Sequence, residues 1–194
     1  MAKIYLYLAK LEDIVAGEIY PQARREEIAS CRNERVRAQK AGVWRLLETG
    51  LSHAFGLELR ELAPTRASNG KWTCPQCYFS LSHGGNSLAA ALSQETVGVD
   101  LEELPNKKLS QKLYDKIVCG QEKKCEADER TIAALWTKKE ALFKRDGGAV
   151  FRPERIDTAA EACASFVWGN AVVSLSGDDF TAYRVEGDTV ELIK

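Results

Sequence analysis

The sequence lacks several features that mark common classes of protein. It has no uncharged apolar run near the ~18 residues of a membrane-spanning helix, and its mean hydropathy is −0.29, so no membrane span is expected. It also lacks an excess of one charge: 27 Lys and Arg stand against 28 Asp and Glu, which argues against a general nucleic-acid-binding protein. The first ten residues contain no separate apolar segment and no cleavage site typical of a signal peptide. We therefore expect neither a membrane nor a nucleic acid as a partner.

Two further absences concern disulfides and nucleotide-binding loops. Six cysteines without an export signal indicate reduced thiols in a cytoplasmic protein. Cys74 and Cys77 have the spacing of half a zinc site, but no second C-x-x-C pair exists; Cys119, Cys125 or His83 could complete it, although nothing in the spacing demands this. A zinc-stabilised, non-catalytic interaction module is one alternative on these grounds. The sequence contains neither G-x-x-x-x-G-K-[ST] nor G-x-G-x-x-G, so the usual phosphate-binding loops are absent.

Hydrophobic periodicity predicts a mixture of helices and strands. Helices are expected at 22–28, 33–55, 107–118 and 128–144. Strands are expected at 3–9, 78–81, 87–92, 97–102, 165–168, 171–176, 180–185 and 189–193, with hairpin turns at 84–86, 169–170, 177–178 and 187–188. Asn33 is expected to cap the long helix, and Gly56 to end it.

Each half of the chain thus holds helices and several strands. This predicts an α+β fold in which two similar-sized lobes pack as a pseudo-dimer. The N-terminal lobe is expected to comprise residues 1–95 and the C-terminal lobe residues 96–194, with the chain crossing near 93–97. Two lobes within one chain favour a monomer.

Acidic residues supply the first candidate site. Asp100 and Glu102 lie two apart in a predicted strand, so both carboxylates point to one face. Such a pair repels unless one acid is protonated or a cation lies between them, and Mg²⁺ prefers these ligands. The alternative is a solvent-facing strand end. Glu140 and Lys144 share one face of a predicted helix. They form either a simple ion pair or a third carboxylate with a lysine that faces phosphates.

Other residues suit contacts to phosphate. Ser82 and His83 precede two glycines at a strand end and can donate hydrogen bonds to a phosphate. Lys71 follows Gly70 in a turn-rich stretch. Residues 24–45 contain seven Lys and Arg against three acids, which suits either a solvated helix surface or a polyanionic ligand.

Four short segments occur in a recognisable order. They are 70–71 (GK), 79–83 (FSLSH), 97–102 (VGVDLE) and 136–144 (WTKKEALFK). Together they resemble the 4′-phosphopantetheinyl transferase superfamily, in particular its surfactin-synthetase-activating, Sfp-like branch. The resemblance implies transfer of 4′-phosphopantetheine from coenzyme A to a serine of an acyl or peptidyl carrier protein, with release of 3′,5′-ADP. It leaves open whether the carrier serves fatty-acid, polyketide or nonribosomal-peptide synthesis.

The resemblance also implies roles for the acidic cluster. Asp100, Glu102 and Glu140 match ligands of Mg²⁺, with Mn²⁺ as the other candidate ion. Glu140 also matches the base that deprotonates the acceptor serine, although the residues leave open whether a water molecule takes that part. Lys144 matches a catalytic lysine that contacts the transferring phosphate.

The remaining implied roles concern coenzyme A. Ser82 and His83 match residues that bind its phosphates, Lys71 matches a nucleotide contact, and Arg37 matches a basic residue near the 3′-phosphate. The sequence departs from the family pattern at Trp72, where proline usually follows Gly-Lys, and in the inserted C-x-x-C.

Carrier proteins of this class are acidic and helical, so a basic surface is expected to steer docking. Arg24, Arg25 and Arg32 are the candidates for that surface. A rival interpretation of the same carboxylates is another Mg²⁺-dependent enzyme, a phosphodiesterase or nucleotide hydrolase that uses water as the acceptor.

Overall fold

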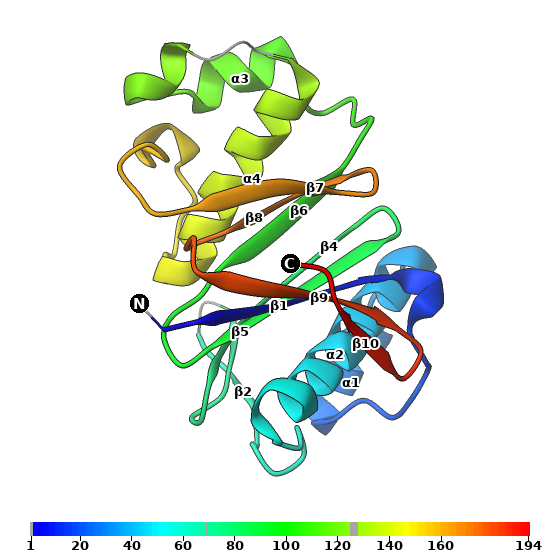
Figure 1. Cartoon of the computed structure of the whole chain (residues 1–194). Helices are drawn as coiled ribbons and strands as arrows, with labels where there is room; N and C mark the ends of the chain where they lie inside the picture. The colour runs from blue at the N-terminus through cyan, green and yellow to red at the C-terminus, as the bar shows by residue number, and fades with distance from the viewer. Residues whose placement is uncertain (1, 69, 125–127) are drawn as a thin grey trace.

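The computed structural model describes residues 2–68, 70–124 and 128–194. Four layers follow one another in Figure 1: helices α3 and α4, a three-stranded sheet, a five-stranded sheet, and helices α1 and α2. The α+β class expected from the sequence is therefore confirmed. No helix among the described residues is long and apolar enough to cross a membrane.

The five-stranded sheet joins the two ends of the chain. Its strand order is β10-β9-β1-β5-β4. The strands are β1 (Ile4–Lys10), β4 (Tyr78–Gly84), β5 (Ser87–Ser93), β9 (Phe180–Glu186) and β10 (Thr189–Leu192). Strand β1 pairs antiparallel with β5 and parallel with β9. Strand β4 is thus left at one edge of the sheet, where it faces the second sheet.

The three-stranded sheet has the order β6-β8-β7, and all its pairs are antiparallel. Its strands are β6 (Val99–Glu103), β7 (Ala164–Trp168) and β8 (Ala171–Leu175). A separate two-stranded ribbon consists of β2 (Thr65–Arg66) and β3 (Trp72–Thr73). This ribbon brings residues 70–72 close to the edge strand β4, which matters for the site described below.

Capping residues set the ends of the two long helices. The four helices are α1 (Gln22–Ala29), α2 (Glu34–Phe55), α3 (Gln111–Ile117) and α4 (Glu129–Asp146). Short 3₁₀ turns lie at Leu11–Asp13, Gly120–Lys124 and Pro153–Arg155. Asn33 Oδ1 accepts a hydrogen bond from Val36 N at 3.1 Å, and Gly56 ends α2 at a φ of 64°. Asp128 and Gly147 do the same for α4. Both caps follow the expected N-cap and C-cap chemistry.

Buried apolar side chains fill every junction between the layers. Trp44 of α2 packs against Leu88 on one face of the five-stranded sheet. Leu6 on the opposite face of that sheet packs against Val173 of the three-stranded sheet. Ile132 of α4 belongs to the cluster that covers the other face of the three-stranded sheet. Both sheets are consequently covered on their two faces, so the edges of the strands are where polar side chains can gather.

One predicted turn is wrong. Gly177 and Asp178 were expected to close a hairpin between the strands on either side of them, but β8 and β9 lie in different sheets. The chain therefore crosses between the sheets twice, once between β5 and β6 and once here. The division into residues 1–95 and 96–194, and the pseudo-dimer, stay predictions. The sheets do not follow that boundary, because β9 and β10 join the sheet of β1.

Gly98 sets the distance between β6 and α4. A Cβ atom at this position would lie 1.8 Å from the backbone oxygen of Ala141 and 2.9 Å from Arg145 N. A close approach to backbone atoms leaves no flexible side chain that could move aside. Gly98 thus allows the helix that carries Glu140 to pack directly on the strand that carries Asp100.

We predict that Gly98→Ala destabilises the protein by about 3 kcal/mol or more, because overpacking against backbone forces strand and helix apart. Gly84→Ala is the matched control, since its Cβ would meet a movable Leu101 methyl at 3.3 Å, and it should cost less than ~1 kcal/mol. Urea unfolding of both variants measures the difference. Equal stability of the two variants would contradict this account of the contact.

Candidate active site

Two serine side chains join the two sheets where β4 runs beside β6. Ser80 Oγ accepts a hydrogen bond from Val99 N at 3.0 Å, and Ser82 Oγ accepts one from Leu101 N at 3.3 Å. Both serines are buried. They satisfy backbone donors of β6 that would otherwise be buried without a partner. Alternate residues of β4 therefore act as side-chain links to the second sheet.

Asp100 lies at the centre of this junction and is 4% exposed. Its Oδ1 accepts hydrogen bonds from Ser82 Oγ at 2.8 Å and from Lys144 Nζ at 2.6 Å. Its Oδ2 is buried and has no hydrogen-bond partner among the described residues. A buried carboxylate oxygen without a donor is costly, so the site is incomplete at this atom.

Two further acids, Glu140 and Glu102, interact electrostatically with Asp100. Burial raises the pKa of Glu140 to about 7, and repulsion by Asp100 adds to the shift. Burial and then repulsion by Asp100 also raise the pKa of Glu102, whose Oε2 accepts a hydrogen bond from Asn106 Nδ2 at 2.8 Å. Carboxylates that disfavour each other's ionisation in this way lie near one another. They do not, however, all bring an oxygen within 4.8 Å of one another.

Lys144 connects the acidic cluster to the edge strand. Besides Asp100, its Nζ donates to the backbone oxygens of Val99 at 3.1 Å and Leu81 at 3.5 Å. Its own backbone oxygen accepts a hydrogen bond from Lys71 Nζ at 2.5 Å. The C-terminal end of α4 is thus tied to β4, to β6 and to the segment before β3.

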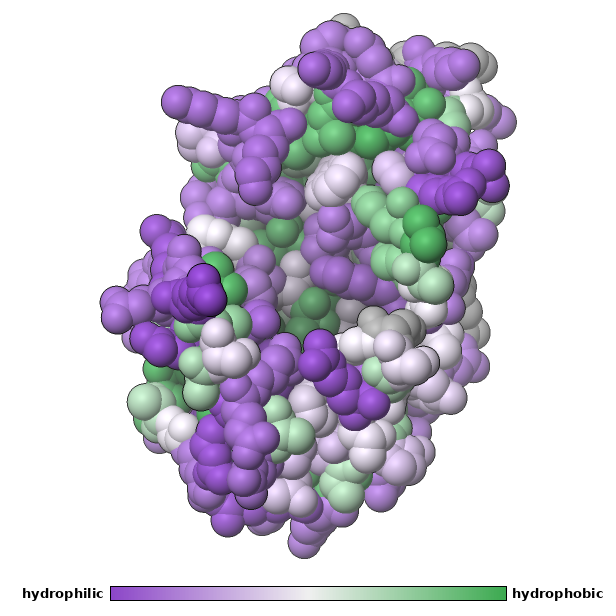
Figure 2. Space-filling model, turned by 180° about the vertical axis from the view of Figure 1, so that it is seen from behind, coloured by the Kyte–Doolittle hydropathy of each residue, from purple (hydrophilic) through white to green (hydrophobic). Residues whose placement is uncertain are grey.

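A cavity of about 350 Å³ lies beside Lys144, between α1 and α2 on one side and the end of α4 on the other. Its apolar wall includes Val43, Phe79 and Leu81, and its cations include Lys71 and Lys144. Figure 2 shows a hollow near the middle of one face of the molecule, with hydrophobic residues at its floor. Its volume and its mixture of apolar surface with a few charged groups are typical of small-molecule sites.

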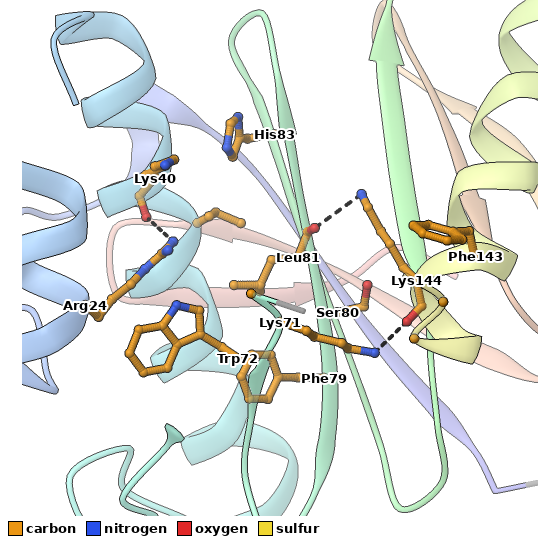
Figure 3. Close-up of a pocket in the computed structure, with 14 residues that line it drawn as sticks. Arg24, Lys40, Lys71, Trp72, Phe79, Ser80, Leu81, His83, Phe143 and Lys144 are labelled. Carbon is orange, nitrogen blue, oxygen red and sulfur yellow. Dashed lines mark hydrogen bonds between the residues drawn. The ribbon is translucent and has the colours of Figure 1, made fainter. Parts of the chain in front are cut away.

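Two further basic residues lie across the cavity from Lys144. They are Arg24 of α1 and Lys40 of α2, as Figure 3 shows. His83 also lines the cavity, and its pKa is lowered by burial and then by the charges of Lys144, Lys40 and Arg24. Burial likewise lowers the pKa of Lys71. This accumulation of positive charge against an apolar wall favours an anionic ligand with a flat or apolar part.

The structure places the five expected coenzyme A contacts differently. Lys71, His83 and Lys144 line the cavity. Ser82 is not among the residues that line it, and its hydroxyl donates to Asp100. Arg37 is 44% exposed in its side chain, forms an ion pair with Glu34 at 3.6 Å and is not part of the cavity wall.

Sequence reasoning did not single out Arg24 and Lys40 as residues of this wall, although both belong to the basic stretch 24–45 for which a polyanionic ligand was one alternative. Lys40 lies three residues after Arg37, one turn along α2, so a helical wheel with Val43 on the buried face could have selected it. Arg24 carried no such signal. It was expected in an exposed docking surface, and that expectation is wrong, because Arg24 is 6% exposed. Its guanidinium lies over the ring of Trp44 at 4.7 Å.

Glu27 of α1 accepts hydrogen bonds from three residues of that wall. Its Oε2 accepts hydrogen bonds from Arg24 Nη1 at 2.8 Å and from Trp72 Nε1 at 2.9 Å, and its Oε1 accepts one from Lys40 Nζ at 3.4 Å. Burial opposes ionisation of Glu27, but these hydrogen bonds and charges outweigh it and lower its pKa to about 2. One carboxylate thus links α1, α2 and β3.

Among the described residues, no set of metal ligands forms around Cys74 and Cys77. Both thiols are free, and the cluster of potential ligands found among the described residues does not include them. Cys125, a candidate to complete the site, lies outside the described residues. The zinc-based interpretation therefore gains no support from the described part of the chain.

The cluster that does form contains Cys119, Glu122 and Asp157. Glu122 Oε2 already accepts a hydrogen bond from the buried Lys139 Nζ at 2.7 Å, and Oε1 accepts two from Thr158 at 2.8 Å each. The ammonium group supplies the positive charge there, so this cluster is a structural ion pair.

Comparison with known proteins agrees with the site geometry. Residues 96–186 match the family model described as the 4′-phosphopantetheinyl transferase superfamily. This segment, just under half of the chain, is therefore similar to that superfamily. It is 33% identical over 95 residues to the 4′-phosphopantetheinyl transferase AcpT of Salmonella typhi, and 32% identical over 95 residues to the AcpT of Salmonella typhimurium. Each match covers 45% of this chain and 50% of the relative, so the chain spans about half the length of the curated relatives it matches.

The superfamily match includes part of the site and leaves part of it out. Asp100, Glu102, Glu140 and Lys144 fall within residues 96–186. The cavity wall of α1, α2 and β3, with His83 of β4, precedes that segment. The similarity to the transferase superfamily therefore covers the acidic half of the site, and the basic wall is known from the structure alone.

Glu27 gives a pH-dependent stability that can be measured. Because its pKa is depressed in the folded chain, its contribution is present above the unfolded pKa of ~4.5 and is lost as pH falls toward 2. We predict that Glu27→Gln lowers the free energy of unfolding by about 2–3 kcal/mol at pH 7. The gap to wild type should shrink by more than half at pH 3. A gap in urea unfolding that stays constant between pH 7 and pH 3 would show that the charge of Glu27 is not the cause.

Proposed function

We propose that this chain transfers 4′-phosphopantetheine from coenzyme A to a serine of an acyl or peptidyl carrier protein, with release of 3′,5′-ADP. The observation that carries the proposal is the position of Lys144. It lies between a cluster of three acids, Asp100, Glu102 and Glu140, and a cavity whose other cations face it. The match of residues 96–186 to the transferase superfamily supports the same reaction.

The acidic cluster fits a hard divalent cation such as Mg²⁺ or Mn²⁺. Asp100 Oδ2 is buried without a partner, and the pKa values of Glu102 and Glu140 are raised partly by repulsion from Asp100. A cation removes both penalties, and oxygen ligands suit these ions. Asp100, Glu102 and Glu140 would hold it. Such an ion, when bound, supplies charge neutralisation and polarisation to a diphosphate.

The cavity suits the nucleotide part of coenzyme A. Its apolar wall accepts a flat base, and its cations on opposite sides can contact separate phosphates. Lys71 and Lys144 would contact the diphosphate, since they lie nearest the acidic cluster. Arg24, Lys40 and His83 take the position proposed from the sequence for Arg37. Ser82 acts on the reaction through Asp100, whose carboxylate it orients.

Two residues would carry the chemistry. The serine oxygen of the carrier attacks the phosphorus next to pantetheine, and the bond from that phosphorus to the bridging oxygen breaks. Glu140 would accept the serine proton, because it is the acid of the cluster that the sequence resemblance matches to the family's base. Lys144 would stabilise the charge that develops on the released 3′,5′-ADP. Alignment and charge stabilisation are the main demands of phosphoryl transfer.

The carrier would dock on exposed basic residues near α1. Arg25 remains a candidate because its side chain is 51% exposed, and Arg32 is exposed as well. An acidic, helical partner is drawn to such a surface by long-range attraction, which acts mainly on the rate of association.

The first test uses an apo carrier protein, coenzyme A and Mg²⁺, with mass spectrometry of the carrier. Wild type should add the mass of phosphopantetheine, and EDTA should stop the reaction until Mg²⁺ is added in excess. Asp100→Asn should lower the rate by about 100-fold or more. Asp188→Asn is the control, because this exposed acid lies in the β9–β10 turn at the opposite edge of the sheet. Formation of 3′,5′-ADP without any carrier would instead support a hydrolase.

The second test concerns the carrier surface. Arg25→Glu and Arg32→Glu should each raise KM for the carrier several-fold, because each reverses a charge facing an acidic partner. KM for coenzyme A should stay unchanged. Lys3→Glu, a reversal at the exposed start of the chain, is the control. An unchanged KM for the carrier in both arginine variants would refute this docking surface.

A further inference from the structure

We propose that Glu27, an acid that contacts the basic wall of the cavity without lining it, is a positioning residue for ligand recognition. This proposal rests on the proposed function, because that function identifies the ligand as coenzyme A. The unusual feature is that a single carboxylate is bound by three residues of the wall, Arg24, Lys40 and Trp72. These residues belong to three separate elements, and all three line the cavity.

Several contacts hold the guanidinium plane of Arg24 in one orientation. Its Nη1 is held by Glu27, its Nη2 donates to the backbone oxygen of Lys40 at 3.4 Å, and its guanidinium lies over the ring of Trp44. Its Nε is buried and has no hydrogen-bond partner among the described residues. An arginine with a fixed plane loses little entropy on binding an anion. Glu27 thus supplies one of the contacts that fix this plane.

Glu27 also changes the net charge of the cavity wall. Arg24 and Lys40 each carry one positive charge and Glu27 carries one negative charge, so the three together keep a net charge of +1. Without Glu27 the two cations would repel each other, and the flexible Lys40 side chain would be free to turn toward solvent, because Glu27 is the partner its ammonium group contacts. The carboxylate therefore lowers the charge of the wall while holding its cations in place. Loss of Glu27 would lower the affinity for an anion if positioning dominates, and would raise it if net charge dominates. The two effects can therefore be separated by experiment.

The position of Arg24 and Lys40 indicates which part of coenzyme A Glu27 would influence. Coenzyme A carries a diphosphate and a separate 3′-phosphate, and its pantetheine arm is neutral. With the diphosphate beside Lys144 and the acidic cluster, the 3′-phosphate is the remaining charged group for the opposite wall, where Figure 3 shows Arg24 and Lys40. Glu27 should therefore influence binding of the 3′-phosphate and leave the transfer step unaffected.

The test compares Glu27→Gln with wild type on coenzyme A and on 3′-dephospho-coenzyme A. Positioning predicts that KM for coenzyme A rises about tenfold while kcat stays within about twofold. For the dephosphorylated substrate, KM should be the same in both proteins. A wall governed by net charge alone predicts the reverse, since removing the anion would lower KM for coenzyme A. A lower or unchanged KM overturns the proposal.

Controls separate positioning from general damage. Glu48→Gln removes another ion-paired carboxylate, from α2, that does not line the cavity, and it should leave both KM values unchanged. A merely structural role for Glu27 would lower kcat, or would raise KM equally for both substrates, and either result overturns the proposal. Should Glu27→Gln fail to fold, Lys40→Gln tests the same wall with the same expected split between substrates.

A direct binding measurement keeps this inference separate from the proposed function. Calorimetry with adenosine 3′,5′-bisphosphate and with adenosine 5′-monophosphate needs no catalysis. Glu27→Gln should weaken binding of the bisphosphate about tenfold and leave the monophosphate unchanged. Weakened bisphosphate binding without any transfer to a carrier would uphold the role of Glu27 while refuting the proposed reaction. Equal losses for both nucleotides would overturn the role of Glu27.

Discussion

The contact between Lys144 and Asp100 is the interaction on which the rest of the site depends. It joins the last turns of α4 to β6, and the same ammonium group also reaches backbone oxygens of β6 and β4. Three elements from distant parts of the chain therefore meet at one charge. Asp100 is almost fully buried, and a buried carboxylate is tolerated only when cations and donors surround it. Ser82 and Lys144 satisfy one of its oxygens, and the other is the reason that the cluster fits a cation.

Local chemistry explains why much of the fold could be predicted from the sequence. The cap at Asn33 and the left-handed Gly56 depend on a few neighbouring residues, so both ends of α2 were found. The error at Gly177 has a different origin. A glycine in a turn signals a change of chain direction, and it does not say whether the next strand pairs with the last one. Here the next strand returns to β1, far away in the sequence. Strand partnership is a long-range property, which short patterns do not encode.

Part of the site could likewise be predicted from the sequence, and part of it could not. The three acids and Lys144 could be selected because their spacing within one strand and one helix puts them on defined faces. The basic wall could not be selected so easily. Lys40 faces the cavity and Arg37 does not, although the two lie one turn apart on α2. Arg24 is buried although it is charged, because Glu27 and the ring of Trp44 compensate its charge. Such compensation depends on the packing of α1 against α2, which the sequence does not show.

The two halves of the site are physically inseparable even though the family match covers only one of them. The matched segment, residues 96–186, includes β9, whose partner in the five-stranded sheet is β1. It also includes α4, whose final turns are held by Lys71 and by the backbone of β4. A segment that pairs its strands with the other half of the chain cannot place Lys144 alone. The acids that would hold a cation and the wall that would hold a nucleotide are consequently fixed relative to each other by the same sheet. The distance between the two is thus set by β4 and β6, through Ser80 and Ser82, without a flexible linker.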